Sequence, residues 1–246
     1  MNSSGVLSII TFVYGLAGFC YMFAWIFKKQ TVSKAATWVA LIGLAGNIVG
    51  IVMRWVESYQ LGFGHAPLSN LYESLVFFAG TIVLIYLVIE RKYGNRAIGA
   101  FVTPLAFLAM AYASLSPNIS DRIQPLIPPL KSNRLIAHVI ACFIGYGAFA
   151  VACGVSLIYL IKQKSADDSG SMMSLLRDAN ILDDLNHQLV MFGFLFLSVG
   201  IITGAVWANS AWGRYWGWDP KETWSLITWF VYATLLHARL MRGWRG

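Results

Sequence analysis

The stretch Gln188-Leu-Val-Met-Phe-Gly-Phe-Leu-Phe-Leu-Ser-Val-Gly-Ile-Ile-Thr-Gly-Ala-Val-Trp-Ala208 contains no charged residue. An uncharged apolar run of about 20 residues has the length that an α-helix needs to cross the hydrocarbon core of a membrane. Six further apolar stretches lie along the chain, and the seven predicted spans are 5–27, 35–56, 70–90, 97–116, 135–161, 188–208 and 220–240. The sequence therefore predicts an all-α protein, a polytopic bundle of seven transmembrane helices.

The composition agrees with a membrane protein. The 246 residues are 58% hydrophobic and 12% charged, whereas a soluble domain has about a quarter of its residues charged. There is no internal repeat and no soluble segment, so we expect one integral-membrane domain over residues 1–246. No basic residue precedes the span 5–27, and no small-residue cleavage site accompanies it. We therefore expect the span to be retained in the protein, unlike a signal peptide.

The basic residues predict the orientation in the membrane. The net charge is +7, but its distribution does not suggest a nucleic-acid partner. Twelve of the 18 basic residues follow predicted spans one, three, five and seven: Lys28, Lys29, Lys34, Arg91, Lys92, Arg96, Lys162, Lys164, Arg177, Arg239, Arg242 and Arg245. Positive residues remain on the cytoplasmic side. We therefore expect the N-terminus and the loop after span six to lie outside a plasma (inner) membrane, in the periplasm of a bacterium, or the protein to lie in the thylakoid of a plastid.

That outer loop is unusually rich in tryptophan. Six of the ten tryptophans fall within residues 207–229, and the densest part reads Trp212-Gly-Arg-Tyr-Trp-Gly-Trp-Asp-Pro-Lys-Glu-Thr-Trp224. An aromatic belt at a membrane surface accounts for one or two tryptophans per helix end. A flat bed formed by Trp212, Trp216 and Trp218 suits a large planar ligand, and haem is the obvious candidate. A purely interfacial belt is the alternative.

Polar residues beside the tryptophans have a structural interpretation as well. Asp219, Pro220 and Glu222 form the pattern of a helix N-cap, first position and capping box, so they are explained without a ligand. Asn70 and Glu73 open span three with the same pattern.

Histidines are the candidate iron ligands, because imidazole is a common axial ligand of haem. His138 lies one turn into span five at its outer end. His237 lies 18 residues after Asp219, about 27 Å deeper at 1.5 Å per residue. A neutral histidine hydrogen-bonded between helices is the alternative for either residue. We expect His65 to be a solvated loop residue and His187 to serve as a cap or in an ion pair at the start of span six.

The sequence resembles a known family at several places. The tryptophan segment over about 207–229, with Trp218-Asp-Pro-Lys-Glu-Thr-Trp224, together with Leu236-His-Ala-Arg239 and Pro67-Leu-Ser-Asn-Leu-Tyr-Glu-Ser74, is similar to the CcsA/ResC family, labelled CcsB in some bacteria. These WWD-domain proteins handle haem in System II cytochrome c biogenesis. The resemblance implies a membrane protein that binds haem b and works with a ResB-like partner.

The resemblance also implies what the site does. Such a protein carries haem across the membrane and presents it, at the outer face, for thioether attachment to the CxxCH motif of apocytochrome c, with thiol-reducing proteins as further partners. His138 is implied to ligate haem at the outer site, and His237 to ligate it within the membrane opposite a histidine of the partner. Asp219 belongs to the same motif, and Arg214, or Lys221 or Arg134, is a candidate to hold the propionates.

The same family continues into an eighth helix with a second outer histidine, whereas this sequence stops at Gly246, so we expect that ligand to come from elsewhere or from a longer chain. Whether this chain or its partner performs the ligation stays open, and the chain is expected to be part of a holocytochrome c synthase complex. The alternatives are a loader of haem onto a chaperone, as in CcmC-type proteins, and a haem exporter or scaffold without ligation activity.

Overall fold

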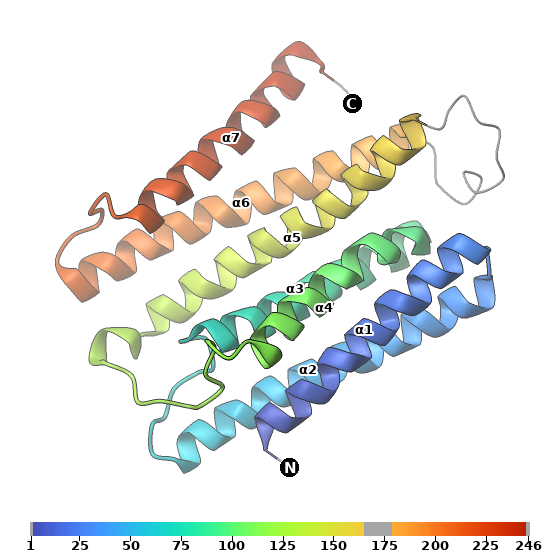
Figure 1. Cartoon of the computed structure of the whole chain (residues 1–246). Coiled ribbons are helices and arrows are strands. Elements are labelled where there is room, and N and C mark those ends of the chain that lie inside the picture. Colours follow the sequence, from blue (N-terminus) through green and yellow to red (C-terminus); the bar gives the residue numbers. More distant parts are fainter. Residues whose placement is uncertain (1, 165–178, 245–246) are drawn as a thin grey trace.

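The computed structural model describes residues 2–164 and 179–244, and within them every regular element is a helix. Seven long helices run side by side along one axis (Figure 1). Their bounds are α1 Ser3–Phe27, α2 Gln30–Gln60, α3 Leu71–Tyr93, α4 Gly99–Leu115, α5 Asn133–Lys164, α6 Ala179–Trp212 and α7 Pro220–Arg242. Two short 3₁₀ helices, η1 Arg96–Ile98 and η2 Pro128–Leu130, precede α4 and α5.

The predicted bundle is confirmed, with one difference in its seventh member. Six helices are long and apolar enough to cross a membrane, counting η1 and α4 as one span over Arg96–Leu115. The helix α7 forms as predicted, but it falls short of the six in apolar character, because polar side chains such as Thr223, Thr228 and His237 interrupt it. In Figure 1 it runs antiparallel to α6, as a spanning helix would.

The helices continue beyond the apolar runs that revealed them. The second was predicted over 35–56 and extends over Gln30–Gln60, and the sixth was predicted over 188–208 and extends over Ala179–Trp212. Backbone hydrogen bonds propagate a helix past the point where its side chains stop being apolar. His187 consequently lies two turns inside α6, and the expectation that it caps this helix is wrong.

The two ends of the bundle differ in the residues that they carry. The end that holds the loop 213–219, the start of α1 and the loop 116–132 is here called the tryptophan end. The opposite end is called the basic end, because it holds Lys28, Lys29, Lys34, Arg91, Lys92, Arg96, Lys162, Arg239 and Arg242. Arg177, Arg245 and the inner-loop segment 165–178 lie outside the described residues.

Glycines allow α5 and α6 to approach until their backbones touch. A Cβ on Gly145 would lie 3.0 Å from the carbonyl oxygen of Gly193, and one on Gly193 would lie 3.1 Å from that of Gly145. Small residues at helix interfaces are the usual means of close packing within a membrane. The pair α5–α6 is therefore the tightest contact in the half of the bundle that holds the tryptophan segment.

Two buried carboxylates of α3 hold the other half together, one at each end. Glu73 accepts a hydrogen bond from Arg54 Nε of α2 at 2.8 Å, and both side chains are almost fully buried. Glu90 accepts from the hydroxyls of Tyr21 and Tyr86, each at 2.7 Å. Thr37 and Arg96 satisfy its second oxygen at 2.6 and 3.0 Å. Buried charges are stable only when paired and hydrogen-bonded in this way.

Candidate functional site

The tryptophan segment forms pairs of rings and not the flat bed predicted from its sequence. Trp207 and Trp212 meet edge to face with ring centroids 6.3 Å apart, and Trp216 and Trp218 do so at 5.8 Å. Edge-to-face contact is favoured because the positive rim of one ring meets the negative face of the other. Trp212 and Trp218 remain 56% and 69% exposed, so large apolar surfaces are open at this end of the molecule.

The segment is anchored to the loop that precedes α5. Trp207 donates its indole N–H to the carbonyl oxygen of Pro129 at 3.0 Å. Arg134, in the first turn of α5, donates to the hydroxyl of Ser210 near the end of α6. Between α4 and α5, residues 116–132 contain one regular element, the short helix η2.

The start of α7 confirms the predicted cap and modifies the predicted box. Asp219 Oδ1 accepts from the Glu222 backbone N–H at 2.9 Å, as an N-cap does. The carboxylate of Glu222 does not return to the N–H of Asp219 but accepts from the N–H of Gly217 at 2.6 Å. The two acidic residues therefore fix the backbone on both sides of Trp218, which has a left-handed conformation with φ 58°.

The same arrangement opens α3. Asn70 accepts from the Glu73 backbone N–H at 2.8 Å, and the carboxylate of Glu73 accepts from the backbone and hydroxyl of Ser69 at 2.9 and 2.8 Å. Glu73 is thus both a capping residue and the partner of Arg54.

Candidate propionate ligands lie around the tryptophan segment. Arg214 is exposed, and its guanidinium packs over the backbone of Gly217, where an added Cβ would lie 2.8 Å from Arg214 Cζ. Lys221 is exposed in the first turn of α7. Trp216 contributes a buried indole N–H that has no partner among the described residues. This end of the bundle therefore presents cations and an unused donor beside exposed indoles.

His138 lies in the interface between α5 and α6, below the tryptophan segment. Its Nδ1 is 2.7 Å from the carbonyl oxygen of Gly200. A Cβ on Gly204 would lie 2.7 Å from the ring, so the imidazole rests directly on the α6 backbone. The thiol of Cys142, one turn further along α5, is 3.6 Å from Nδ1.

The position of His138 determines which nitrogen carries the proton. A carbonyl oxygen can only accept, so Nδ1 is the donor and Nε2 of the neutral ring holds the lone pair. Histidines that bind iron or zinc have this arrangement, with the second nitrogen donating to a backbone carbonyl or a carboxylate.

His237 is not brought near His138. It is exposed on α7, toward the basic end. The contacts that hold α7 to α5 and α6 include the stacked rings of Tyr232 and Phe149, the hydrogen bond of 2.9 Å from Trp229 Nε1 to Ser198, and the ion pair of Arg239 with Asp183.

His65 differs from its sequence-based interpretation. It is buried, with 6% of its surface exposed, and the expectation that it is a solvated loop residue is wrong. Its two ring nitrogens lie 3.1 Å from the carbonyl oxygen of Ala66 and 3.0 Å from that of Gln124. The ring thereby fastens the loop before α3 to the loop before α5.

The comparisons with known proteins agree with this description. Residues 68–246 match a family described as cytochrome C assembly protein. The chain is 35% identical over 272 residues to the cytochrome c biogenesis protein CcsA of Trieres chinensis, covering 98% of this chain and 84% of that one. It is 36% identical over 292 residues to the CcsA protein of Gloeobacter violaceus, covering 98% and 83%.

A further relative is the CcsA protein of Parasynechococcus marenigrum, 39% identical over 244 residues, or 87% of this chain and 78% of that one. Among solved structures, the fold is similar to that of the cytochrome c haem lyase CcmF, with a TM-score of 0.72 at 15% identity. That match covers 99% of this chain and 43% of CcmF, so the similarity concerns the fold alone.

Proposed function

This chain belongs to the CcsA family of cytochrome c assembly proteins, and from that membership we propose that it is the haem-handling part of a cytochrome c synthetase. In this proposal it binds haem b, carries it through the membrane and presents it at the tryptophan end, together with a ResB-like partner. The substrate that receives the haem is the CxxCH motif of an apocytochrome c, whose cysteines are kept reduced by thiol-reducing proteins.

The position of His138 is the observation that supports this proposal most directly. The hydrogen bond to Gly200 keeps the proton on Nδ1, so Nε2 is available as an axial ligand of haem iron. The described neighbour of Nε2 is the Cys142 sulfur at 4.0 Å, the outer limit of a hydrogen bond to sulfur. The imidazole also lies below the segment whose exposed indoles suit a large planar ring.

Charges around the same segment suit the rest of the haem. Propionates are carboxylates. The candidate cations are Arg214, which packs on Gly217, Arg134, which is bonded to Ser210, and Lys221, which is exposed in the first turn of α7. Charge-assisted hydrogen bonds from guanidinium to carboxylate are stronger than neutral ones. In this proposal Trp212, Trp216 and Trp218 contact the ring, and Asp219 acts through the loop conformation that it fixes.

Thioether formation requires that haem be positioned, and it requires no reactive side chain from this protein. Each thioether forms when a cysteine S–H adds across a haem vinyl group: sulfur bonds to one vinyl carbon and the proton goes to the other. No atom is lost and no oxidant is needed. The nucleophiles belong to the apocytochrome, so the contribution of this chain is to hold haem in the right orientation, which turns a slow encounter into a near-intramolecular step.

The basic end lies in the cytoplasm in this proposal, as the positive-inside rule requires, and haem moves from there to the tryptophan end. His237 stands on an exposed face of α7 toward the basic end. A second protein with its own histidine would complete the iron ligation there. Haem would therefore have two stations, with His237 at the inner one and His138 at the outer one.

The test is an absorption spectrum of the purified chain, reduced minus oxidised, with and without a ResB-like partner. His138→Ala should remove or alter the haem of the outer station, and His237→Ala that of the inner one. Ile202→Ala and Val231→Ala, at exposed apolar positions of α6 and α7, are the matched controls. Full haem content with unchanged spectra in both His138→Ala and His237→Ala would refute the ligand assignment.

Covalent attachment needs its own measurement. The complex should convert an apocytochrome with a CxxCH motif into a haem-stained product, and the His138→Ala complex should form much less of it. Haem bound at both stations without any covalent product would point instead to a haem exporter or a chaperone loader.

A further inference from the structure

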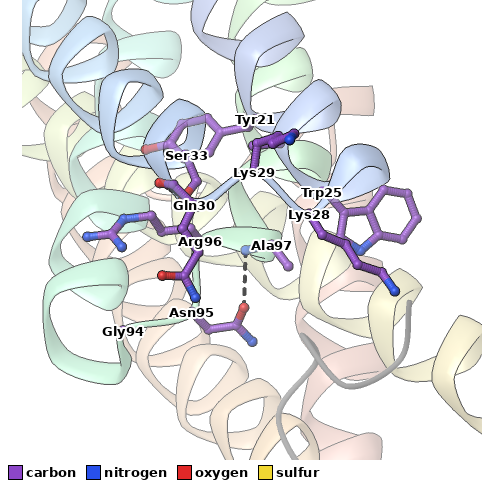
Figure 2. A pocket seen from close by; sticks show the side chains of 11 residues that line it. Tyr21, Trp25, Lys28, Lys29, Gln30, Ser33, Gly94, Asn95, Arg96 and Ala97 are labelled. Carbon is purple, nitrogen blue, oxygen red and sulfur yellow. Dashed lines mark hydrogen bonds between the residues drawn. The ribbon is translucent and has the colours of Figure 1, made fainter. Parts of the chain in front are cut away.

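A pocket of about 210 Å³ lies at the basic end, remote from the tryptophan segment, between the α1–α2 turn and the turn that joins α3 to η1 (Figure 2). Its lining includes Trp25, Lys28, Lys29, Gln30, Asn95 and Arg96. Three of these six residues are cations, and the lining contains no acidic residue. The pocket therefore has the charge expected of an anion-binding site.

Arg96 connects the pocket to the buried carboxylate of Glu90. Its Nε donates to Glu90 Oε1 at 3.0 Å and lies 3.2 Å from the hydroxyl of Thr37. The guanidinium has further N–H donors besides Nε. Glu90 itself does not line the pocket and is already satisfied by three hydroxyls and Arg96. Its charge is thus compensated by these four contacts.

Two buried donors of the lining residues have no acceptor among the described residues. Asn95 is 5% exposed; its Oδ1 accepts from the Ala97 N–H at 3.1 Å, as Figure 2 shows, while its Nδ2 has no partner. The indole Nε1 of Trp25 has none either. Nearly all buried donors in proteins are hydrogen-bonded, because leaving one unpaired costs its full desolvation. Two unpaired donors beside one pocket are therefore evidence that an acceptor binds there.

A helix N-terminus adds to the same site. The helix α2 is 31 residues long, its N-cap is Lys29, and no side chain of the described residues caps it. The first N–H groups of a helix have no intrahelical partner and carry a partial positive charge, which makes them a common site for phosphate. Gln30, in the first turn of α2, belongs to the pocket lining.

We propose that this pocket binds a phosphate group, as offered by an anionic phospholipid headgroup or by free inorganic phosphate. The oxygens of a tetrahedral anion suit the cations of the lining and its two unpaired donors. The position of the pocket at the end of α1 favours the lipid as the source of the phosphate. The last two turns of this helix expose Phe23, Ile26 and Phe27, against which acyl chains would lie. Basic pockets between transmembrane helices on the cytoplasmic side bind anionic headgroups in this manner.

The experiment uses the full chain in neutral detergent. Native mass spectrometry measures retention of dioleoylphosphatidylglycerol against dioleoylphosphatidylcholine, and calorimetry measures binding of inorganic phosphate. Asn95→Asp keeps the oxygen that caps Ala97 and replaces the Nδ2 donor, Trp25→Phe removes only the indole donor, and Lys29→Gln removes one charge. Arg91→Gln is the matched control, because it removes one charge at the same end outside the pocket lining.

Asn95→Asp replaces a donor with a carboxylate that repels the anion, and Lys29→Gln removes a positive charge, so each should weaken anion retention at least about tenfold, the effect of losing one hydrogen bond to a charged group. Arg91→Gln should leave it unchanged. Phosphatidylglycerol that resists displacement by inorganic phosphate identifies the lipid as the ligand, and phosphate that displaces it identifies the free ion. Equal losses in Lys29→Gln and Arg91→Gln, or none in any variant, would overturn the proposal. Should Asn95→Asp lose helix content by circular dichroism, Trp25→Phe and Lys29→Gln decide.

Discussion

Arg239 of α7 and Asp183 of α6 are joined by two parallel hydrogen bonds of 2.6 Å each, from Nη1 to Oδ1 and from Nη2 to Oδ2. This bidentate pair is the strongest geometry that the two side chains allow. It stands two residues beyond His237, on a helix that has few other attachments to the bundle. The ion pair is therefore one of the contacts that hold the part of α7 carrying His237 against α6.

Loss of that ion pair should loosen α7. Arg239→Ala should lower the free energy of unfolding by about 2 kcal/mol, the worth of hydrogen bonds to charged groups, and should weaken haem at the inner station. Thermal unfolding and haem titration of the purified chain measure the two effects. Arg242→Ala is the control, because this residue is exposed and lies one turn later. Equal losses of stability and haem affinity in both variants would show that the net charge of α7, and not the ion pair, determines them.

A methyl group on Gly204 should disturb the outer station. An added Cβ would lie 2.7 Å from Cε1 and Nδ1 of His138, so Gly204→Ala must displace the imidazole and break its bond to Gly200. Haem affinity at the tryptophan end should fall at least as far as one lost hydrogen bond predicts, about tenfold. Ile202→Ala, an exposed position of the same helix, should retain haem. A wild-type spectrum in Gly204→Ala would argue against His138 as a ligand.

The buried pair of Arg54 and Glu73 should show a characteristic pattern of stability. Glu73→Ala leaves a guanidinium buried without its carboxylate and should cost about 3–5 kcal/mol. The double variant Arg54→Met, Glu73→Met removes both charges and should recover a large part of that loss. Unfolding in a denaturing detergent series provides the comparison. A double variant as unstable as the single one would mean that the contacts of Glu73 with Ser69, and not the ion pair, carry the stability.

Substitutions of Trp218 should affect the stability of the loop and the binding of haem in opposite directions. Its φ of 58° is left-handed, a conformation that costs a residue with a side chain about 1–2 kcal/mol. Trp218→Gly should therefore stabilise the local loop conformation while weakening haem binding, because the indole surface is lost. Trp218→Phe keeps both the strained backbone and an aromatic ring, so it should stay near the wild type in both measurements. Haem affinity that is unaffected by Trp218→Gly would remove this residue from the site.

Local features of the fold were predictable from the sequence. Each apolar run predicts its own helix, because the requirement that backbone polar groups be satisfied in lipid leaves no other option. The caps at Asn70 and Asp219 were predictable for the same reason, since an N-cap depends on residues only three positions apart. The helix ends were less accurate, because hydropathy reports where the membrane ends and not where backbone hydrogen bonding ends.

Contacts between distant segments were not predictable in the same way. The sequence offers no means of pairing Arg54 with Glu73, or of placing His65 against the carbonyl of Gln124, because these contacts require the helices to be packed. A signal was nevertheless present: Arg54 and Glu90 are charged residues inside predicted spans 35–56 and 70–90, and such residues are expensive unless they have a partner or a function. The pocket beside Asn95 needed three separate segments and left no trace in the sequence.

The contact between Gly145 and Gly193 has a mechanical consequence. With two backbones this close, α5 cannot slide or rotate against α6 without driving side chains such as Phe149 into the space that the glycines leave. The two helices must therefore move as one stiff rod, with the imidazole of His138 fixed near one tip and Asp183, which holds α7, near the other. A displacement of the tryptophan segment therefore shifts both helices together as far as the basic end, where Asp183 draws α7 along.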